Sequence, residues 1–190
     1  MNDLNEKVRG FFNHDIGKMI VPDLQRLRRE IRPDRSGLAG CTVPTAMFAF
    51  AVLDLVGYLT REDPNARRDQ TEKNIQHALS RFSPLEYSRY ADLLIKLVRH
   101  GIVHQALPKA AGIAKADAAR LVTFGSRGIP GVNVDRLVDD LLEVLGALET
   151  EVRSAPNGQL ARRMKCRVEE LQKTDAELGS KIMKIAKAGP

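Results

Sequence analysis

The chain contains few cysteines and no long hydrophobic segment that lacks a proline or a charge. Cys41 and Cys166 are its only cysteines, and their spacing does not suggest a disulfide framework, so a reducing cytosol fits and we expect buried, non-nucleophilic thiols. The first residues lack the basic-then-apolar order of a secretory signal. The longest apolar stretch, residues 42–59, is interrupted by Pro44 and Asp54 and predicts a core helix rather than a membrane span. We therefore expect a cytoplasmic protein without membrane association.

Positive charge is concentrated near the C-terminus. The formal net charge is +6, and residues 158–190 contain eight Lys or Arg against four Asp or Glu. Such a segment can bind RNA phosphates or an acidic protein, but an amphipathic helix packed on the body or on a dimer partner explains it equally well. With 43% hydrophobic residues and no internal repeat, residues 1–157 are expected to form one helical bundle, followed by a basic amphipathic helix over residues 158–190.

Apolar residues recur at helical spacing along most of the chain. They predict a helix over residues 4–31, which Pro22 should kink or break near Val21, and a further helix over residues 43–60. Asp63-Pro64-Asn65 is expected to interrupt the chain, and a polar helix over residues 66–80 is expected after it. Ser83-Pro84-Leu85-Glu86 is a strong helix start, because a serine cap, a proline at the first helical position and a glutamate three residues after the serine form a capping box.

Two more helices are expected in the second half of the chain. Asn133 is placed to cap a helix with a regular leucine stripe, and Pro156-Asn157-Gly158 separates it from a last helix over residues 159–187. That last helix has heptad-like apolar spacing, with Asp175 at one seam position; the apolar members are Met164, Val168, Leu171, Leu178, Ile182 and Ile185.

Residues 107–132 are rich in glycine and proline and carry little helical signal. Residues 119–124 could form a short strand, and a short hairpin near residues 113–124 is a further expectation. Residues 125–131 could offer backbone N–H groups to a phosphate, but they lack the ending of a nucleotide-binding loop and are better interpreted as a plain turn. The fold class predicted is all-α, with five to seven helices and one irregular crossover.

The main candidate site is the cluster Arg99, His100 and His104, at the end of the helix that starts near Ser83. Arginine can hold two phosphate oxygens, and histidine can exchange protons near neutral pH. On a regular helix, five residues turn through about 500°, so Arg99 and His104 point about 140° apart. They can act on one ligand only if the helix end loosens, as Gly101 would allow, or if a second subunit completes the site. Arg9 and His14 have the same spacing.

The cluster resembles the signature of the HEPN family (higher eukaryotes and prokaryotes nucleotide-binding). That signature is an arginine, a polar residue, a few further residues and a histidine, which Arg99, His100 and His104 match in order and spacing. The match is close over residues 95–105 and loose over residues 43–152. Arg9 and His14 depart from it, because Gly10 fills the polar position.

The resemblance implies an up-and-down helical bundle that acts as a metal-independent endoribonuclease without a cofactor, often as the toxin of a toxin–antitoxin or defence system. It implies RNA as substrate, a homodimer whose interface carries a composite site, and an antitoxin as a further partner. Arg99 would bind phosphate, His104 would transfer protons, and His100 would orient one of them. The alternative is a non-catalytic helical module that binds nucleic acid or protein.

Other polar residues suggest weaker hypotheses. His100 and His104 stand four residues apart, as zinc ligands on a helix do, but further ligands such as His77, Cys41 or Asp92 would be needed. Asp54 needs a polar partner if it is buried, and Arg99 is one candidate. The acidic pairs Asp139-Asp140 and Glu169-Glu170 are interpreted as solvated faces.

Overall fold

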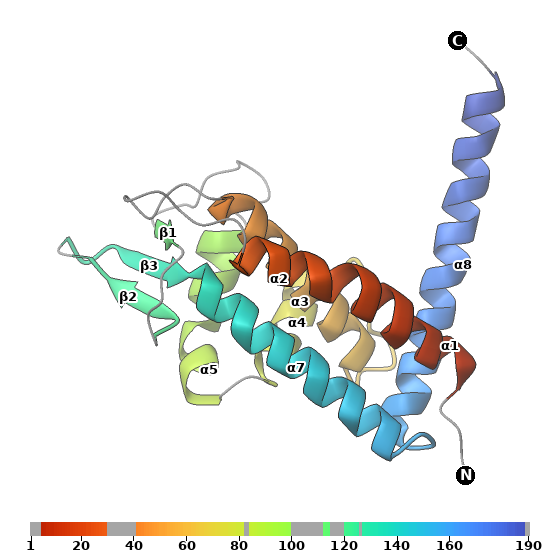
Figure 1. Cartoon of the computed structure of the whole chain (residues 1–190), viewed down its shortest axis with the longest axis horizontal. Coiled ribbons are helices and arrows are strands. Elements are labelled where there is room, and N and C mark those ends of the chain that lie inside the picture. Colours follow the sequence, from red (N-terminus) through yellow and green to blue (C-terminus); the bar gives the residue numbers. More distant parts are fainter. Residues whose placement is uncertain are drawn as a thin grey trace.

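The computed structural model describes residues 5–29, 41–81, 84–99, 112–114, 120–125 and 127–188, with the backbone only for residues 84–86, 97–99 and 185–188. Helices make up most of this chain, and a small three-stranded sheet lies at one end of the molecule (Figure 1). At the other end, the last helix extends away from the rest of the protein (Figure 1). The prediction of a mostly helical fold is confirmed.

The first helix is continuous past the proline. It consists of α1 (Glu6–Gly10), a π-helical segment η1 (Phe11–Ile20) and α2 (Val21–Arg29). The expected break at Pro22 does not occur, since Val21 keeps right-handed helical angles and donates to the Ile16 carbonyl five residues earlier. This wider pairing relieves the clash between a proline ring and the carbonyl four residues before it. The buried face of this helix comprises Val8, Phe11, Phe12, Ile16 and Leu24.

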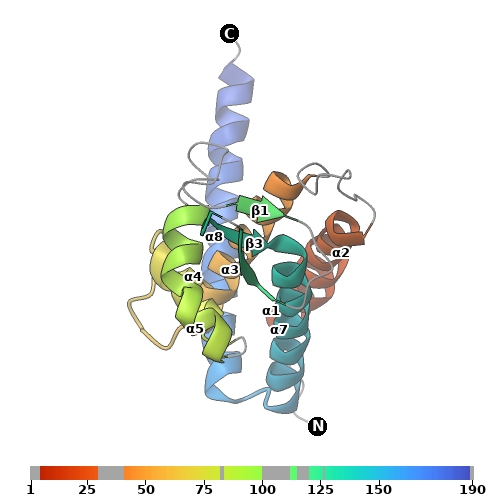
Figure 2. The same ribbon diagram turned by 90° about the vertical axis from the view of Figure 1, so that its left-hand side faces the viewer.

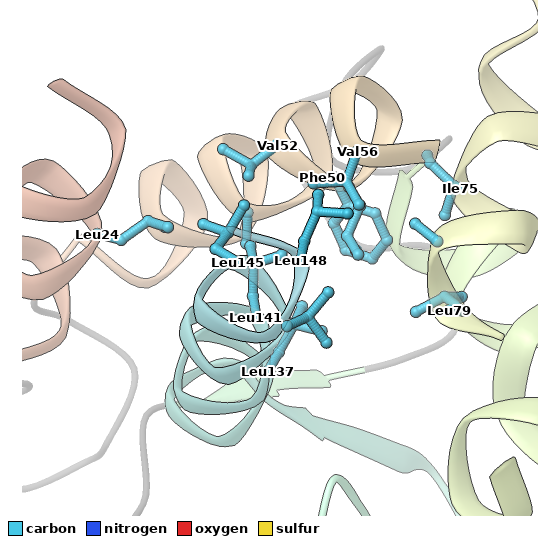
Figure 3. Packing of buried hydrophobic residues seen from close by; sticks show 14 of the residues in the cluster. Leu24, Phe50, Val52, Val56, Ile75, Leu79, Leu137, Leu141, Leu145 and Leu148 are labelled. Atoms are coloured by element: carbon cyan, nitrogen blue, oxygen red, sulfur yellow. The ribbon is translucent and has the colours of Figure 1, made fainter. Parts of the chain in front are cut away.

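Helix α3 (Thr42–Thr60) is the centre of the core. It contacts α2, α4, α7 and α8, and its buried residues lie all around its axis, as expected for a helix that is apolar on every side. By length and composition α3 could cross a membrane, but 61% of its apolar window is buried inside the protein. Figure 3 shows Phe50, Val52 and Val56 of α3 packed among leucines of α7 and residues of α4. The predicted core helix is confirmed.

Helix α4 (Thr71–Leu79) starts five residues later than predicted. The segment before it forms turns, in which the Asp63 carboxylate accepts from the Asn65 N–H at 2.8 Å and the Gln70 N–H donates to the Arg67 carbonyl at 3.2 Å. An aspartate that satisfies the backbone two residues on favours a turn over a helix start. Residues 66–70, where a polar helix is expected, therefore form turns instead.

Helix α5 (Pro84–Leu93) begins at the proline predicted to start it and continues into the π-helical segment η2 (Leu94–Arg99). Tyr87 and Leu94 are fully buried, so this helix is anchored to the body at both ends. Helix α7 (Val134–Ser154) also starts as predicted, since the Asn133 side chain accepts from the Arg136 N–H. Its stripe of Leu137, Leu141, Leu145 and Leu148 is buried (Figure 3).

The sheet has the order β1 (Gly112–Ala114), β3 (Pro130–Asn133), β2 (Val122–Phe124). The hairpin is formed by β2 and β3, which are antiparallel, and β1 pairs with β3 in parallel, so the hairpin expected near residues 113–124 is wrong in position. Proline and glycine make β3 a weak strand by sequence, and its pairing with β1 is long-range. The loop between β2 and β3 is the plain turn expected there: the Gly125 N–H donates to the Ile129 carbonyl at 3.0 Å, and Gly128 has φ +70°.

Helix α8 (Gln159–Ala188) is the longest element. Its first half packs on α1 and α3, where Met164 and Val168 are fully buried. Beyond Asp175 it leaves the body, and Leu178, Ile182 and Met183 are more than half exposed. Figure 2 shows this second half standing clear of the other helices and strands. Only the first part of the heptad pattern of α8 therefore packs against the body.

Candidate functional site

In the sequence, the candidate catalytic cluster follows the helix formed by α5 and η2. Arg99 is the last residue of η2, so its backbone position is known. The Arg99 side chain, His100 and His104 lie outside the described residues. The structure therefore places the backbone of Arg99 in η2 and does not test whether the three side chains converge.

The helix that leads to Arg99 is fixed by a buried polar contact with α7. The Tyr87 hydroxyl donates to the Asp140 carboxylate at 2.5 Å, and Arg136 donates to the same carboxylate at 2.9 Å. Tyr87 is 1% exposed and Asp140 is 9% exposed. A buried carboxylate held by a hydroxyl and a guanidinium is well satisfied and directional. This contact sets the position of α5 against α7 only a few helical turns from the motif.

The acidic pairs are not simply solvated, contrary to the prediction. Besides the contact of Asp140, Asp139 accepts from the Arg28 guanidinium, with the Nε at 3.1 Å from Oδ1. Glu170 accepts from the Tyr58 hydroxyl at 2.5 Å, and the Glu169 carboxylate lies 3.4 Å from the Lys7 ammonium. Neighbouring helical residues point about 100° apart, so each pair reaches two different elements.

The partner of Asp54 is Asn74. The Asn74 side-chain amide donates to Asp54 at 2.9 Å and accepts from Arg61 at 2.8 Å, and Arg61 also donates to Asp63 at 2.7 Å. Gly57 makes this chain of contacts possible, because a Cβ there would lie 1.8 Å from the Asn74 carbonyl oxygen. The α3 and α4 backbones thus touch at Gly57, and the polar groups around them are paired.

Two arginines of the basic tail donate hydrogen bonds to backbone carbonyls at the end of α3. Arg163 donates to the Thr60 carbonyl at 2.6 Å, and Arg167 donates to the Tyr58 carbonyl and, at 2.9 Å, to the Asp63 carbonyl. The last carbonyls of a helix have no intrahelical donor and carry partial negative charge, so guanidinium groups stabilise them. Burial lowers the pKa of the Arg167 guanidinium and, together with the Glu170 hydrogen bond, raises the pKa of Tyr58. These arginines are structural rather than free to bind a phosphate.

A pocket of about 290 Å³ lies between the ends of α3, α4 and α7 and the start of α8. Its lining includes His77, Arg81, Arg163 and Glu151. Arg81 donates to Glu151 at 2.6 Å, so the charges on the two sides of the pocket are balanced. Burial, followed by the nearby Arg81 charge, lowers the pKa of His77. A neutral imidazole at the wall of a pocket can exchange protons, but Glu62 and Glu151 of the lining balance the charges of Arg81 and Arg163.

His77 contributes a buried ring nitrogen to the lining of this pocket. Its Nε2 is buried and has no hydrogen-bond partner within the described part of the chain. Sequence reasoning considered His77 only as a supplementary zinc ligand. No signal in the sequence links it to Arg163, because α8 returns to α4 from a distant part of the chain.

The additional metal ligands considered from the sequence are not brought together. Among the described residues, no group of three His, Cys, Asp or Glu side chains could hold a metal ion. Asp92 is exposed beside Lys96 on α5, and Cys41 lies exposed before α3. Cys166 is exposed as well, so the prediction of buried thiols is wrong for both cysteines.

No family model, curated protein or solved structure matches this chain.

The arginines at the end of α3 are the residues that sequence reasoning missed most clearly. Arg163 and Arg167 stand four residues apart and flank Met164 and Val168, which the heptad pattern places on the buried seam. Charged residues this close to a buried seam can be expected to reach a polar group of the body. The sequence signal was present, but its target, the carbonyls of residues 58 and 60, depends on the tertiary fold.

Proposed function

We propose that the protein is a metal-independent endoribonuclease of the HEPN type, acting as a homodimer with a composite site. The observation that carries the proposal is the cluster Arg99, His100 and His104 at the end of a helix fixed to the body by the contact of Tyr87 with Asp140. A two-fold axis near this helix end would let the arginine of one copy and the histidine of the other meet at one phosphate.

The chemistry follows from the side chains. The RNA 2′-hydroxyl attacks the adjacent phosphorus, and the bond to the 5′-oxygen breaks, which leaves a 2′,3′-cyclic phosphate and a 5′-hydroxyl. His104 removes the hydroxyl proton or protonates the leaving oxygen. Arg99 binds two phosphate oxygens and stabilises the charge of the pentacoordinate transition state. DNA lacks the nucleophile and is not a substrate, and neither metal nor cofactor takes part.

The test is RNA cleavage by the purified protein in the presence of a chelator. We expect cleavage by the wild type and loss of at least about a hundredfold in Arg99→Ala and in His104→Ala, in line with the loss of an acid–base or charge-stabilising group. The matched controls are Arg9→Ala and His14→Ala, which remove the same residue types at the same spacing and lie exposed on the first helix. They should cleave as the wild type does.

The product provides a second check. A cyclic phosphate end and resistance of RNA with a 2′-deoxy group at the cleaved position are expected. Absence of cleavage, or equal cleavage by all variants, would refute the nuclease.

The second candidate is a non-catalytic binding module, and the exposed half of α8 favours it. Leu178, Ile182 and Met183 are 54–57% exposed on a helix that contacts nothing else in the described chain beyond Asp175. If no cleavage is found, such a module is the function that remains. The antitoxin or other protein partner implied by the resemblance would then be sought by its binding to α8.

A further inference from the structure

The hairpin of β2 and β3 carries an aromatic ring that the body does not cover. Phe124, the last residue of β2, is 62% exposed, and no other phenylalanine or tyrosine in the described part of the chain is classed as exposed. Phe124 pairs with Pro130 across the hairpin, and Val122 pairs with Val132. Opposite residues share a face of a sheet and side chains alternate along a strand, so all four lie on one face. Val122 and Val132 are at most 4% exposed, so Phe124 continues a buried face outward, beyond the body.

The hairpin also presents positive charge that no carboxylate balances. Arg120 comes just before β2 and Arg127 lies in the turn, and both are exposed. Neither guanidinium makes a hydrogen bond or an ion pair with the part of the chain that the structure describes. Residues 118–134 contain no Asp or Glu, and residues 99–134 contain five Lys or Arg against one Asp. The charge of this segment therefore favours a polyanion as partner.

The turn between the two strands leaves room for a second backbone to approach. Gly128 has φ +70°, and a Cβ added there would meet nothing within 4 Å. The Gly128 N–H donates to the Gly125 carbonyl at 2.9 Å, and the Gly125 N–H donates to the Ile129 carbonyl at 3.0 Å. Because these two N–H groups are used within the turn, the binding of a phosphate falls to the arginine side chains.

The hairpin lies on the side of the molecule that carries Arg99. Figures 1 and 2 show the helix formed by α5 and η2 at the same end of the molecule as the sheet, and Arg99 is the last residue of η2. Helix α8 stands at the opposite side in Figure 1. A single strand bound at the hairpin is therefore closer to the proposed cleavage site than one bound along the end of α8.

We propose that the β2–β3 hairpin binds the single-stranded RNA next to its point of cleavage. One base stacks on the Phe124 ring, Arg120 and Arg127 bind neighbouring phosphates, and the phosphate that is attacked stays at Arg99. Every base has a flat face that can stack on an aromatic side chain, so this contact needs no particular sequence. The choice of RNA over an acidic protein rests on the proposed function. The contact itself uses no 2′-hydroxyl, so single-stranded DNA should bind to the hairpin without being cut.

The first test is the affinity of the full chain for a labelled, unstructured single-stranded DNA oligonucleotide, measured by fluorescence anisotropy. Phe124→Leu keeps an apolar side chain but removes the ring, and it should bind about tenfold more weakly because one stacked base is lost. Phe124→Tyr keeps the ring and should bind as the wild type does. The matched control is Met19→Ala, which removes another apolar side chain, 55% exposed on η1, and should change nothing. All these side chains are exposed, so circular dichroism should show a folded protein in every variant.

The second test concerns the phosphates and uses the same oligonucleotide over a range of salt concentrations. Arg120→Gln and Arg127→Gln should each reduce the slope of log affinity against log salt by about 0.7, the contribution of one phosphate contact on a single strand. The matched control is Arg162→Gln, which removes an exposed arginine of α8 and should leave the slope unchanged.

Three results would overturn the proposal. The first is equal affinity of the wild type, Phe124→Leu and Met19→Ala, whether all of them bind or none does. The second is a loss of affinity in Arg162→Gln but not in Arg127→Gln, which would place the strand on α8. The third is binding of polyglutamate as tight as that of the oligonucleotide, since a chain of carboxylates has no base to stack.

Failure of the hairpin contact and failure of the nuclease are distinguishable. Cleavage of RNA is measured separately with the Arg99 and His104 variants. If the protein cuts no RNA but binds DNA in a manner that depends on Phe124, the hairpin contact stands and the nuclease does not. If it cuts RNA and Phe124→Leu binds DNA as the wild type does, the nuclease stands and the hairpin contact does not.

Discussion

Replacement of Gly57 by alanine should destabilise the protein strongly, although alanine is the better helix former. On helix propensity alone, the change would add about 1 kcal/mol to the free energy of unfolding. In the structure, however, the new Cβ would lie 1.8 Å from the Asn74 carbonyl oxygen and 2.8 Å from the Asn74 Cα. Both atoms belong to the α4 backbone, so no side-chain rotation can relieve the contact.

The magnitude follows from how far α4 has to move. Ordinary contact begins near 3.4 Å, so the two helices must separate locally by about 1.6 Å. Overpacking of this kind costs about 3 kcal/mol at its upper end. The shift also stretches the hydrogen bonds of Asn74 to Asp54 and Arg61, which costs about 1.5 kcal/mol more. After subtraction of the gain in propensity, the free energy of unfolding should fall by about 3.5 kcal/mol, and the melting temperature of a chain this long by about 7–14 °C.

The assay is thermal and denaturant unfolding followed by circular dichroism. The matched control is Gly146→Ala, because Gly146 is an exposed glycine within α7 whose added Cβ would meet nothing within 4 Å. That variant should be about 1 kcal/mol more stable than the wild type. If Gly57→Ala were as stable as Gly146→Ala, the close approach of α3 and α4 would be refuted, and with it the explanation of the half-buried Asp54.

Two more predictions concern buried polar groups. Tyr87→Phe removes one of the donors to the buried Asp140 carboxylate and should lower the free energy of unfolding, measured by denaturant titration, by about 2 kcal/mol. The control Tyr90→Phe, on the more exposed side of α5, should change this free energy little. Equal effects of the two substitutions would contradict the role of the contact between Tyr87 and Asp140. Burial lowers the pKa of His77 below its ordinary value of 6.5, so the unfolded chain takes up this proton at a higher pH than the folded protein. The free energy of unfolding should therefore decrease as the pH falls below 6.5, and His77→Gln should reduce that decrease while His14→Gln should not; a pH profile unchanged by His77→Gln would refute this, because it would show that the ring binds its proton equally well in the folded and the unfolded state.

Local signals predicted the helix starts correctly. Asn133 caps α7 and Pro84 begins α5, because caps and first-turn prolines act on the residues next to them. The helix predicted over residues 66–80 starts only at Thr71, since the Gln70 side chain accepts from the Arg67 N–H at 3.4 Å and the Gln70 N–H donates to the Arg67 carbonyl in a turn. Competition between a side chain and the helix for the same N–H group is not visible in periodicity.

Contacts between residues far apart in the chain could not be predicted from the sequence. The partners of Asp139 and Glu170 are Arg28 and Tyr58, which lie more than a hundred residues away in the sequence. Both acidic pairs were therefore interpreted as solvated faces. The parallel pairing of β1 with β3 was missed for the same reason. The cluster at Arg99 remains a prediction, because a motif gives residue types and spacing, while its function depends on where a second copy lies.

The contacts of α8 change what the positive charge of the chain implies. The eight basic residues after position 158 suggest a surface for RNA, but Arg163 and Arg167 stabilise the carbonyl end of α3. Charge counted along a sequence therefore overstates the charge that a ligand meets. An RNA cut by this protein would have to be held largely at the helix end of Arg99, and this is why loss of that single guanidinium should affect binding as well as the chemical step.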